Sequence, residues 1–359
     1  MRLLLLLALA LSAAAAAGQP ALTAPLDSLA RAHAEAEGLP SLVVGVVAGG
    51  EHYVVGVGAV DSVGTAPDAH TLYEIGSISK VLTGLALADA VVRGEATLET
   101  PVADLLSDSL SVPEFEGAPI ELGHLATHAS GLPRLPLNLA FAPGFDIRDP
   151  YAQYDPDLLA LFLRTQRLTA APGTAFAYSN IGAGLLGYAL AQRAGTDYAA
   201  LVRQRVLTPL NMDETYALVP DAMAHRLATP HGQAGEPVPH WTWTEPTVGA
   251  GGWRSSADDL LTLAEAAIEP GSTPLAEAVA LSLRPRFDVG DGRRVGLGWF
   301  FLPNPGGPDV AAHDGGTGGF VSFLAVVPEA GVGLVVLTNR QASVDAFALD
   351  LLTRLLRAE

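Results

Sequence analysis

The segment Gly76-Ser77-Ile78-Ser79-Lys80 begins a helical pattern that we expect to extend to Val92. Ser77 and Lys80 are three residues apart, about one helical turn, so the hydroxyl and the amine are expected on the same helix face. Lys80 is the single lysine of the chain, and a buried lysine, unlike an arginine, can lose its proton. A compositional bias toward arginine would also leave few lysines, but it does not explain the position of this one. The pair predicts a nucleophile, Ser77, beside a base, Lys80.

The composition describes a folded chain with an acidic surface. The chain has 359 residues, of which 49% are hydrophobic and 16% charged, which is typical of one large domain or two closely packed domains and not of disorder. The formal net charge of −18 disfavours nucleic acids and anionic membranes as partners. The absence of cysteine excludes disulfides, thiolate metal sites and a lipid anchor on an N-terminal cysteine.

Residues 1–18 are typical of a secretory signal peptide. Met1-Arg2 gives a basic start, residues 3–17 are apolar except for one serine, and small residues precede a cleavage point at Gly18 or Gln19. The apolar run is short for a membrane span, which needs about 20 residues, although an uncleaved anchor is the alternative. We expect a secreted or periplasmic mature protein, residues 19–359, without a stable membrane span after cleavage.

Strand patterns occupy both ends of the mature chain, and helical patterns occupy the middle. The patterns predict an α+β fold in which both termini, about residues 19–75 and 250–359, build an antiparallel sheet flanked by helices. About residues 77–249 form an inserted, mostly helical subdomain, and Gly249 to Gly252 is expected to be flexible. The expected helices are 26–36, 77–92, 122–125, 157–164, 181–193, 198–206, one ending at 267 and 344–356, and the expected strands are 41–48, 52–57, 296–302, 319–327 and 332–338.

Two further clusters carry candidate chemistry. Tyr178 and Asn180 are two residues apart in an extended or turning segment, so their side chains are expected on one side. A tyrosine with a lowered pKa can relay a proton, and an asparagine can hydrogen-bond a substrate amide. The run from His313 to Gly319 contains many glycines, which allow a substrate backbone to approach and leave N–H groups free to donate. A simple hairpin turn is the alternative for this run.

The three clusters, in this order, resemble the class C β-lactamase and low-molecular-weight penicillin-binding protein family of serine hydrolases. That family is marked by Ser-x-x-Lys, Tyr-x-Asn and a Lys/His-x-Gly element. Residues 125–133 resemble the family's Leu-x-Thr-His-x-Ser-Gly-Leu-Pro segment, and residues 251–259 and 296–299 are similar to other family segments. The resemblance covers nearly the whole mature chain and implies the serine β-lactamase/D,D-peptidase fold.

The resemblance implies an acyl-enzyme mechanism on Ser77. Lys80 would hold or accept the serine proton and Tyr178 would relay protons to the leaving group, with either as the main base. Asn180 would bind the substrate amide, and the N–H groups of Ser77 and Gly316 would hold the oxyanion, each donor contributing about 10²–10³ in rate. No cofactor or metal is implied, because a neutral lysine and a tyrosine do the proton work that a zinc-bound water does elsewhere.

The third cluster departs from strict class C β-lactamases, which have Lys-Thr-Gly where this chain has His313-Asp314-Gly315. A permanent cation becomes a titratable imidazole, and a hydroxyl that would help to hold a substrate carboxylate becomes an acid. Thr317 or Arg340 would have to compensate. Histidine at this position is more similar to D,D-peptidases, D-amino-acid peptidases and esterases of the family.

The sequence therefore predicts a secreted serine hydrolase acting on D-Ala-D-Ala-type peptides or β-lactams, with a peptidoglycan peptide or another small molecule as substrate. An esterase that uses the same Ser-Lys-Tyr site is the alternative. A non-catalytic cell-wall sensor is disfavoured because Ser77, Lys80 and Tyr178 are all present. An ordinary Ser-His-Asp esterase is disfavoured because no Gly-x-Ser-x-Gly element occurs.

Other residues have plainer interpretations. His128 is expected to be a structural hydrogen-bonding group in its loop, and Ser79 is expected to face away from Lys80. Trp241 and Trp243 would either line a substrate cleft or pack between subdomains. A metal site is not expected at the loop histidines, because no close carboxylates or thiols accompany them. The loop histidines are His225, His231 and His240.

Overall fold

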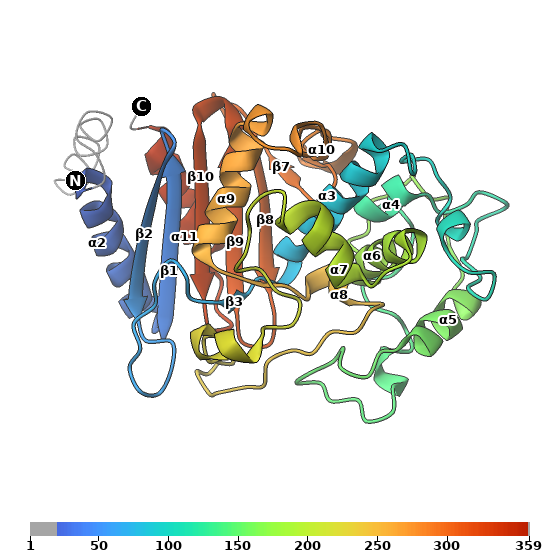
Figure 1. Cartoon of the computed structure of the whole chain (residues 1–359), viewed down its shortest axis with the longest axis horizontal. Helices are drawn as coiled ribbons and strands as arrows, with labels where there is room; N and C mark the ends of the chain where they lie inside the picture. Colours follow the sequence, from blue (N-terminus) through green and yellow to red (C-terminus); the bar gives the residue numbers. More distant parts are fainter. Residues whose placement is uncertain (1–19, 358–359) are drawn as a thin grey trace.

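The computed structural model describes residues 20–357. The predicted signal peptide, residues 1–18, lies outside the described residues. The main sheet has eight strands in the order β2-β1-β10-β9-β8-β7-β6-β5, and its neighbours are antiparallel. Strands from the two ends of the chain meet where β1 pairs with β10 (Figure 1). The prediction of one antiparallel sheet built from both termini is therefore confirmed.

The central strands are nearly continuous runs of β-branched and aliphatic residues, as expected for strands covered on both faces. Along β1, Val43 and Val47 pack into the core on one side of the sheet, whereas Val44 and Val46 pack into the core on the other. The strands are β1 Ser41–Ala48, β2 Glu51–Gly58, β3 Tyr73–Glu74, β4 Arg254–Ser255, β5 Phe287–Gly290, β6 Arg293–Val295, β7 Phe300–Leu302, β8 Val310–Gly316, β9 Val321–Val327 and β10 Val332–Thr338.

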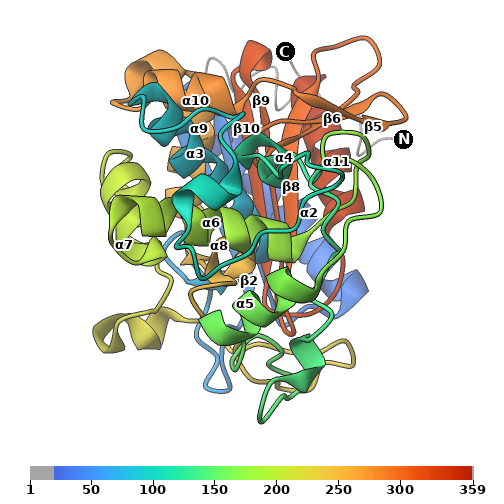
Figure 2. The same cartoon turned by 90° about the vertical axis from the view of Figure 1, so that its right-hand side faces the viewer.

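Helices cover both faces of the sheet and give three layers. α2 (Pro20–Glu37) and α11 (Asp345–Leu356) lie on one face, and α9 (Ala257–Ile268) lies on the other (Figure 1). The remaining helices lie in front of the sheet in Figure 2, and all but Ala276–Ser282 begin within about residues 77–249. They are α3 Ser79–Val92, α4 Leu122–Ala126, α5 Pro156–Thr165, α6 Asn180–Ala194, α7 Tyr198–Val202, α8 Val248–Gly251 and α10 Ala276–Ser282. No helix among the described residues is long and apolar enough to span a membrane.

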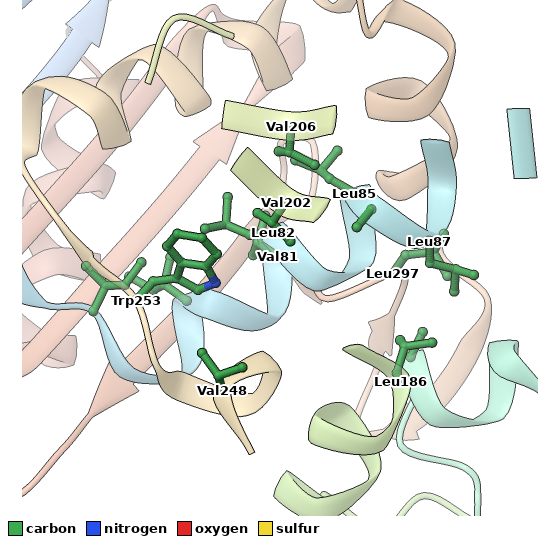
Figure 3. Close-up of a cluster of buried hydrophobic side chains, with 14 of the residues drawn as sticks. Val81, Leu82, Leu85, Leu87, Leu186, Val202, Val206, Val248, Trp253 and Leu297 are labelled. Atoms are coloured by element: carbon green, nitrogen blue, oxygen red, sulfur yellow. The ribbon is translucent and has the colours of Figure 1, made fainter. Parts of the chain in front are cut away.

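The helix that carries Lys80 is the centre of the larger core. Nearly all of α3 is buried, and its Leu82 and Leu85 side chains are at most 1% exposed. Figure 3 shows α3 side chains packed among Val248, Trp253 and residues of three other segments. Truncating one such leucine to alanine costs about 2–5 kcal/mol. The packing therefore holds the first turn of α3 in a fixed place.

One expectation about a glycine-rich segment was wrong. Residues 249–252 are not flexible: α8 includes Gly249 and Gly251, and all four residues are buried. The run from 313 to 319, for which a hairpin turn was the alternative, has both features: residues 313–316 belong to strand β8, and the residues after them form the turn to β9. In both places glycine permits close backbone packing instead of mobility. The strands β5 and β6 were not expected, because they are short and their residues are mostly exposed.

The end of β8 forms an open edge. The short strand β7 pairs only with residues 310–312 of β8, whereas β9 pairs with β8 as far as Gly316. Residues 313–316 therefore lack a partner strand on one side. This is the part of β8 that lies next to the 3₁₀ turn Gly76–Ile78 at the start of α3.

Candidate active site

Ser77 and Lys80 meet as the sequence predicts. Ser77 lies in the 3₁₀ turn that leads into α3, and Lys80 follows one turn later. The Lys80 Nζ atom lies 2.8 Å from the Ser77 Oγ atom and donates a second bond, 2.6 Å long, to the Ala250 carbonyl. The lysine is 3% exposed. Burial, helped by the charge of Arg134, lowers the pKa of Lys80 to about 7, although the charge of Asp314 raises it.

Tyr178 lies on the other side of this pair. It comes just before α6, whose N-cap Ser179 accepts a bond from the Gly182 N–H. The Lys80 Nζ atom is 5.0 Å from the centre of the Tyr178 ring. Burial raises the pKa of Tyr178 well above its usual value, and a hydrogen bond with Ser77 offsets part of this effect. At neutral pH the phenol therefore keeps its proton and can donate it.

The His128 ring supports Tyr178. The two ring centres are 4.3 Å apart, and the His128 Nδ1 atom accepts a bond from the Ser179 N–H. His128 is buried, and burial lowers its pKa well below the usual value. Its φ of 57° is in the left-handed region that few side chains adopt. The arrangement agrees with a structural role for this histidine.

The glycines of β8 bring two N–H groups to the nucleophile. A Cβ atom on Gly315 would lie 2.1 Å from the Ile75 carbonyl oxygen, and one on Gly76 would lie 2.5 Å from the Gly316 nitrogen. The Thr317 N–H donates to Phe320 across the β9 side. Because N–H directions alternate along a strand, the Gly316 N–H points to the open edge. The N–H of Ser77, in the first turn of the helix, has no partner within that helix. These two N–H groups are the candidate oxyanion hole.

Asn180 starts α6 and reaches the same space. Its backbone N–H donates to the Arg134 carbonyl, and its side-chain Nδ2 donates to the Tyr151 hydroxyl at 3.3 Å. Its Oδ1 atom is buried and has no hydrogen-bond partner among the described residues. This oxygen is therefore available to accept a bond from a substrate N–H.

His313 is buried and neutral. Its Nδ1 atom lies 2.6 Å from the Asp314 carbonyl oxygen, and burial lowers its pKa to about 4. The imidazole therefore does not replace the permanent cation of a Lys-Thr-Gly motif. Arg340 does not compensate, because its guanidinium donates to the carbonyls of Glu37, Gly38 and Gln233, outside the cavity. Thr317 is buried and lines the cavity.

One cavity of about 890 Å³ brings the predicted residues together. Lys80 lies behind Ser77 and is not part of the wall. Figure 2 shows this side of the molecule, with α4, α5 and α6 in front of the sheet. The predicted residues that line the cavity are Ser77, Tyr178, Asn180, His313, Gly315, Gly316 and Thr317.

Several wall residues were missed or left open by the sequence. Trp241 and Trp243 line the cavity, and Trp243 stacks on Tyr151 with 4.3 Å between ring centres. Arg134 packs over the Tyr178 ring at 5.0 Å, and Asp345 lies at the start of α11. Only Arg134 had a local signal, since it follows the Gly-Leu-Pro segment. Trp241 and Trp243 lie in a loop and Asp345 begins α11, and only the fold brings them together.

The loop histidines hold other partners. His231 contacts the Asn339 carbonyl and His240 contacts the Glu74 carboxylate, while His225 is exposed. A separate group that could geometrically hold a metal comprises His70, Glu214 and Asp258. Glu214 already forms a 2.7 Å ion pair with Arg226, and a guanidinium there competes with a metal cation.

Comparisons with known proteins agree with the motifs. The Beta-lactamase family model matches residues 26–358. The D-alanyl-D-alanine-carboxypeptidase/endopeptidase AmpH of Escherichia coli (strain K12) is 29% identical over 291 residues, which cover 76% of this chain and 72% of that protein. A Beta-lactamase of Pseudomonas fluorescens is 27% identical over 351 residues, or 88% and 92% of the two chains. The solved structure of a class C beta-lactamase matches with a TM-score of 0.78 and 23% identity over 93% of this chain and 94% of that chain, which confirms the expected fold.

Proposed function

The chain belongs to the Beta-lactamase family of serine hydrolases, and we propose that it is an exported hydrolase of D-alanyl peptides of the peptidoglycan type. The reaction proceeds through an acyl-enzyme on Ser77. Export rests on the signal-like residues 1–18. The observation that carries the proposal is the contact between the buried Lys80 amine and the Ser77 hydroxyl in the wall of the cavity.

Acylation follows from the geometry of three side chains. Neutral Lys80 takes the Ser77 proton as the oxygen attacks the substrate carbonyl. The opposite shifts of the two pKa values, down for Lys80 and up for Tyr178, favour the lysine as the base. The N–H groups of Ser77 and Gly316 stabilise the developing oxyanion.

The leaving group departs with a proton from Tyr178, which Lys80 then replenishes. Water hydrolyses the acyl-enzyme by the reverse sequence of proton transfers. Asn180 accepts a bond from the substrate amide and fixes its orientation. Tyr178 can act as this proton donor because burial raises its pKa and keeps the phenol protonated.

The third motif favours a peptidase over an efficient β-lactamase. His313 is neutral, so the cavity lacks the cation that a Lys-Thr-Gly motif supplies next to the reacting carbonyl. The similarity to a carboxypeptidase/endopeptidase supports the same choice. An esterase using Ser77 is the second candidate, because an ester does not require carboxylate recognition.

A fluorescent penicillin with intact-mass analysis tests the proposal, using the native protein, Ser77→Ala and Lys80→Arg. A stable adduct on Ser77, absent in both variants, supports a penicillin-binding peptidase. Turnover without an accumulated adduct supports a β-lactamase. Cleavage of p-nitrophenyl esters without any reaction of the drug promotes the esterase. Equal ester cleavage by all three proteins would show that the proposed site is wrong.

A further inference from the structure

One wall of the cavity carries side-chain hydrogen-bond acceptors that have no donor partner among the described residues. His313 has a 2.6 Å contact from Nδ1 to a carbonyl oxygen, so Nδ1 carries the hydrogen and Nε2 carries a lone pair. The side chain is 2% exposed, and Nε2 has no hydrogen-bond partner among the described residues. A carboxylate next to Nε2 would meet a lone pair, whereas an N–H donor would be bound.

Two carboxylates extend this wall. Asp314 alternates with the buried His313 and Gly315 along β8, so its side chain is exposed into the cavity. Asp345 lines the same cavity from the first turn of α11, and its Oδ1 atom is buried without a hydrogen-bond partner among the described residues. Burial raises the pKa of Asp345, and the charge of Asp314 raises it further. The two acids are therefore close enough to act on each other.

The cations that line the cavity form no ion pair with these two carboxylates among the described residues. Arg134 packs over the Tyr178 ring, at 5.0 Å, and Arg293 on β6 faces Asp291 at 3.7 Å. Neither arginine is among the groups that shift the pKa of Asp345. Asp314 and Asp345 are therefore not paired with a cation among the described residues, although the charge of Arg134 also acts on Lys80 and Tyr178.

This wall lies on the side of the leaving group. The Tyr178 ring, which carries the proton donor, is 6.3 Å from the His313 ring. The charge of Asp314 acts on both Tyr178 and Lys80. Asp314 is therefore close enough to the proton donor of the leaving group for its charge to act there.

We propose that the site selects leaving groups that bear an ammonium group, and disfavours leaving groups that end in a free carboxylate. The ammonium would donate to Asp314 and Asp345, while the lone pair of His313 Nε2 would repel a carboxylate beside the reacting bond. The reaction is otherwise an ordinary acyl transfer. Ser77 forms its ester bond, the bond from the carbonyl to the leaving nitrogen or oxygen breaks, and the serine proton is delivered to that atom. Among peptides, this favours an internal bond to a diamino compound over release of a C-terminal D-alanine. The inference rests on the proposed function.

Matched substrates test the inference. N-acetyl-D-alanyl amides of 1,4-diaminobutane, n-butylamine and 4-aminobutyrate share one acyl group and carry cationic, neutral and anionic leaving groups. We expect kcat/KM for the cationic amide to exceed that for the anionic one by about 30-fold at low salt, and by less at high salt. The variants are Asp314→Asn, Asp345→Asn and the double variant. Asp350→Asn, on the exposed side of the same helix, is the control.

The outcomes distinguish a failure of this inference from a failure of the proposed function. A ratio of cationic to anionic kcat/KM that collapses to a few-fold in the double variant, but keeps its native value in the Asp350→Asn control, supports the inference. A native enzyme that cleaves the anionic amide as well as the cationic one overturns it, although the proposed function survives. If no amide is cleaved, the proposed function fails. Calorimetric binding of the three amides to Ser77→Ala then decides the inference, which is overturned by equal affinities for the cationic and anionic amides.

Discussion

Replacing Lys80 by methionine should stabilise the protein at neutral pH while abolishing its activity. Burial and the charge of Arg134 lower the pKa of Lys80 from 10.5 to about 7. One pKa unit corresponds to about 1.4 kcal/mol, so burying the protonated amine costs about 5 kcal/mol of folding free energy below pH 7. Methionine has a similar length and no charge. It also removes the donor to the Ala250 carbonyl, and an unpaired buried carbonyl costs about 1–3 kcal/mol. The net gain in unfolding free energy below pH 7 is about 2–4 kcal/mol.

The sign of the pH dependence is fixed by the direction of the shift. Between pH 7 and 10.5 the unfolded chain keeps the Lys80 proton and the folded chain does not, so native stability rises with pH. The stability of Lys80→Met does not rise with pH in this way. The excess of its unfolding free energy over that of the native protein should therefore fall by about 1.4 kcal/mol per pH unit, or about 2 kcal/mol between pH 7.5 and 9.0. Lys80 is the only lysine in the chain, so no other lysine contributes.

Urea unfolding of both proteins at pH 6.0, 7.5 and 9.0 measures the difference directly, with activity measured in parallel. Activity should fall by at least about 10²-fold, the usual contribution of a general base. A stability difference that is the same at all three pH values would refute the depressed pKa of Lys80. It would also refute the assignment of this lysine as a base that is neutral at rest.

Two further predictions concern the same site. The native kcat/KM should rise with pH through about 7 as Lys80 loses its proton. Arg134→Gln should move the inflection of the pH–rate profile to higher pH, because the charge of the arginine lowers the pKa of Lys80. An inflection at the same pH in both proteins would contradict this. Glu74 is 2% exposed, accepts the Trp241 N–H at 3.0 Å and pairs with Arg254 at 3.1 Å. Glu74→Gln removes the carboxylate partner of the buried Arg254 guanidinium, which keeps only carbonyl acceptors, so it should cost about 3 kcal/mol in urea unfolding. By loosening the Trp241 wall it should also raise KM more than it lowers kcat. A pure loss of kcat would contradict a positioning role.

The parts of the fold that the sequence predicted are those with strong local patterns. The valine-rich strands β1 and β10 and the serine and lysine one turn apart on α3 are local signals, and all appear where expected. Tyr178 reaches Ser77 only because α6 packs beside α3. The contact between Tyr178 and Ser77 was expected only from the resemblance of the motifs to a family. The spacing of the two residues in the sequence does not predict it.

The remainder depends on contacts between distant segments. The Ala250 carbonyl that accepts from Lys80 lies in a segment that was expected to be flexible. The sequence shows the glycines of this segment but not how they pack. Asp345 looked like an ordinary residue at a helix start. Its place in the cavity follows from the position of α11 beside β10, which the sequence pattern does not specify.

The glycines around α3 connect this packing to the chemistry. A Cβ atom on Gly84 would lie 2.1 Å from the Leu297 carbonyl oxygen, and one on Gly298 would lie 2.3 Å from the Lys80 carbonyl oxygen. Only a backbone without side chains can approach the helix this closely. The approach excludes water from the turn that carries Lys80, and desolvation is the largest cause of its lowered pKa. The base is therefore produced as much by the glycines that close the core as by the lysine itself.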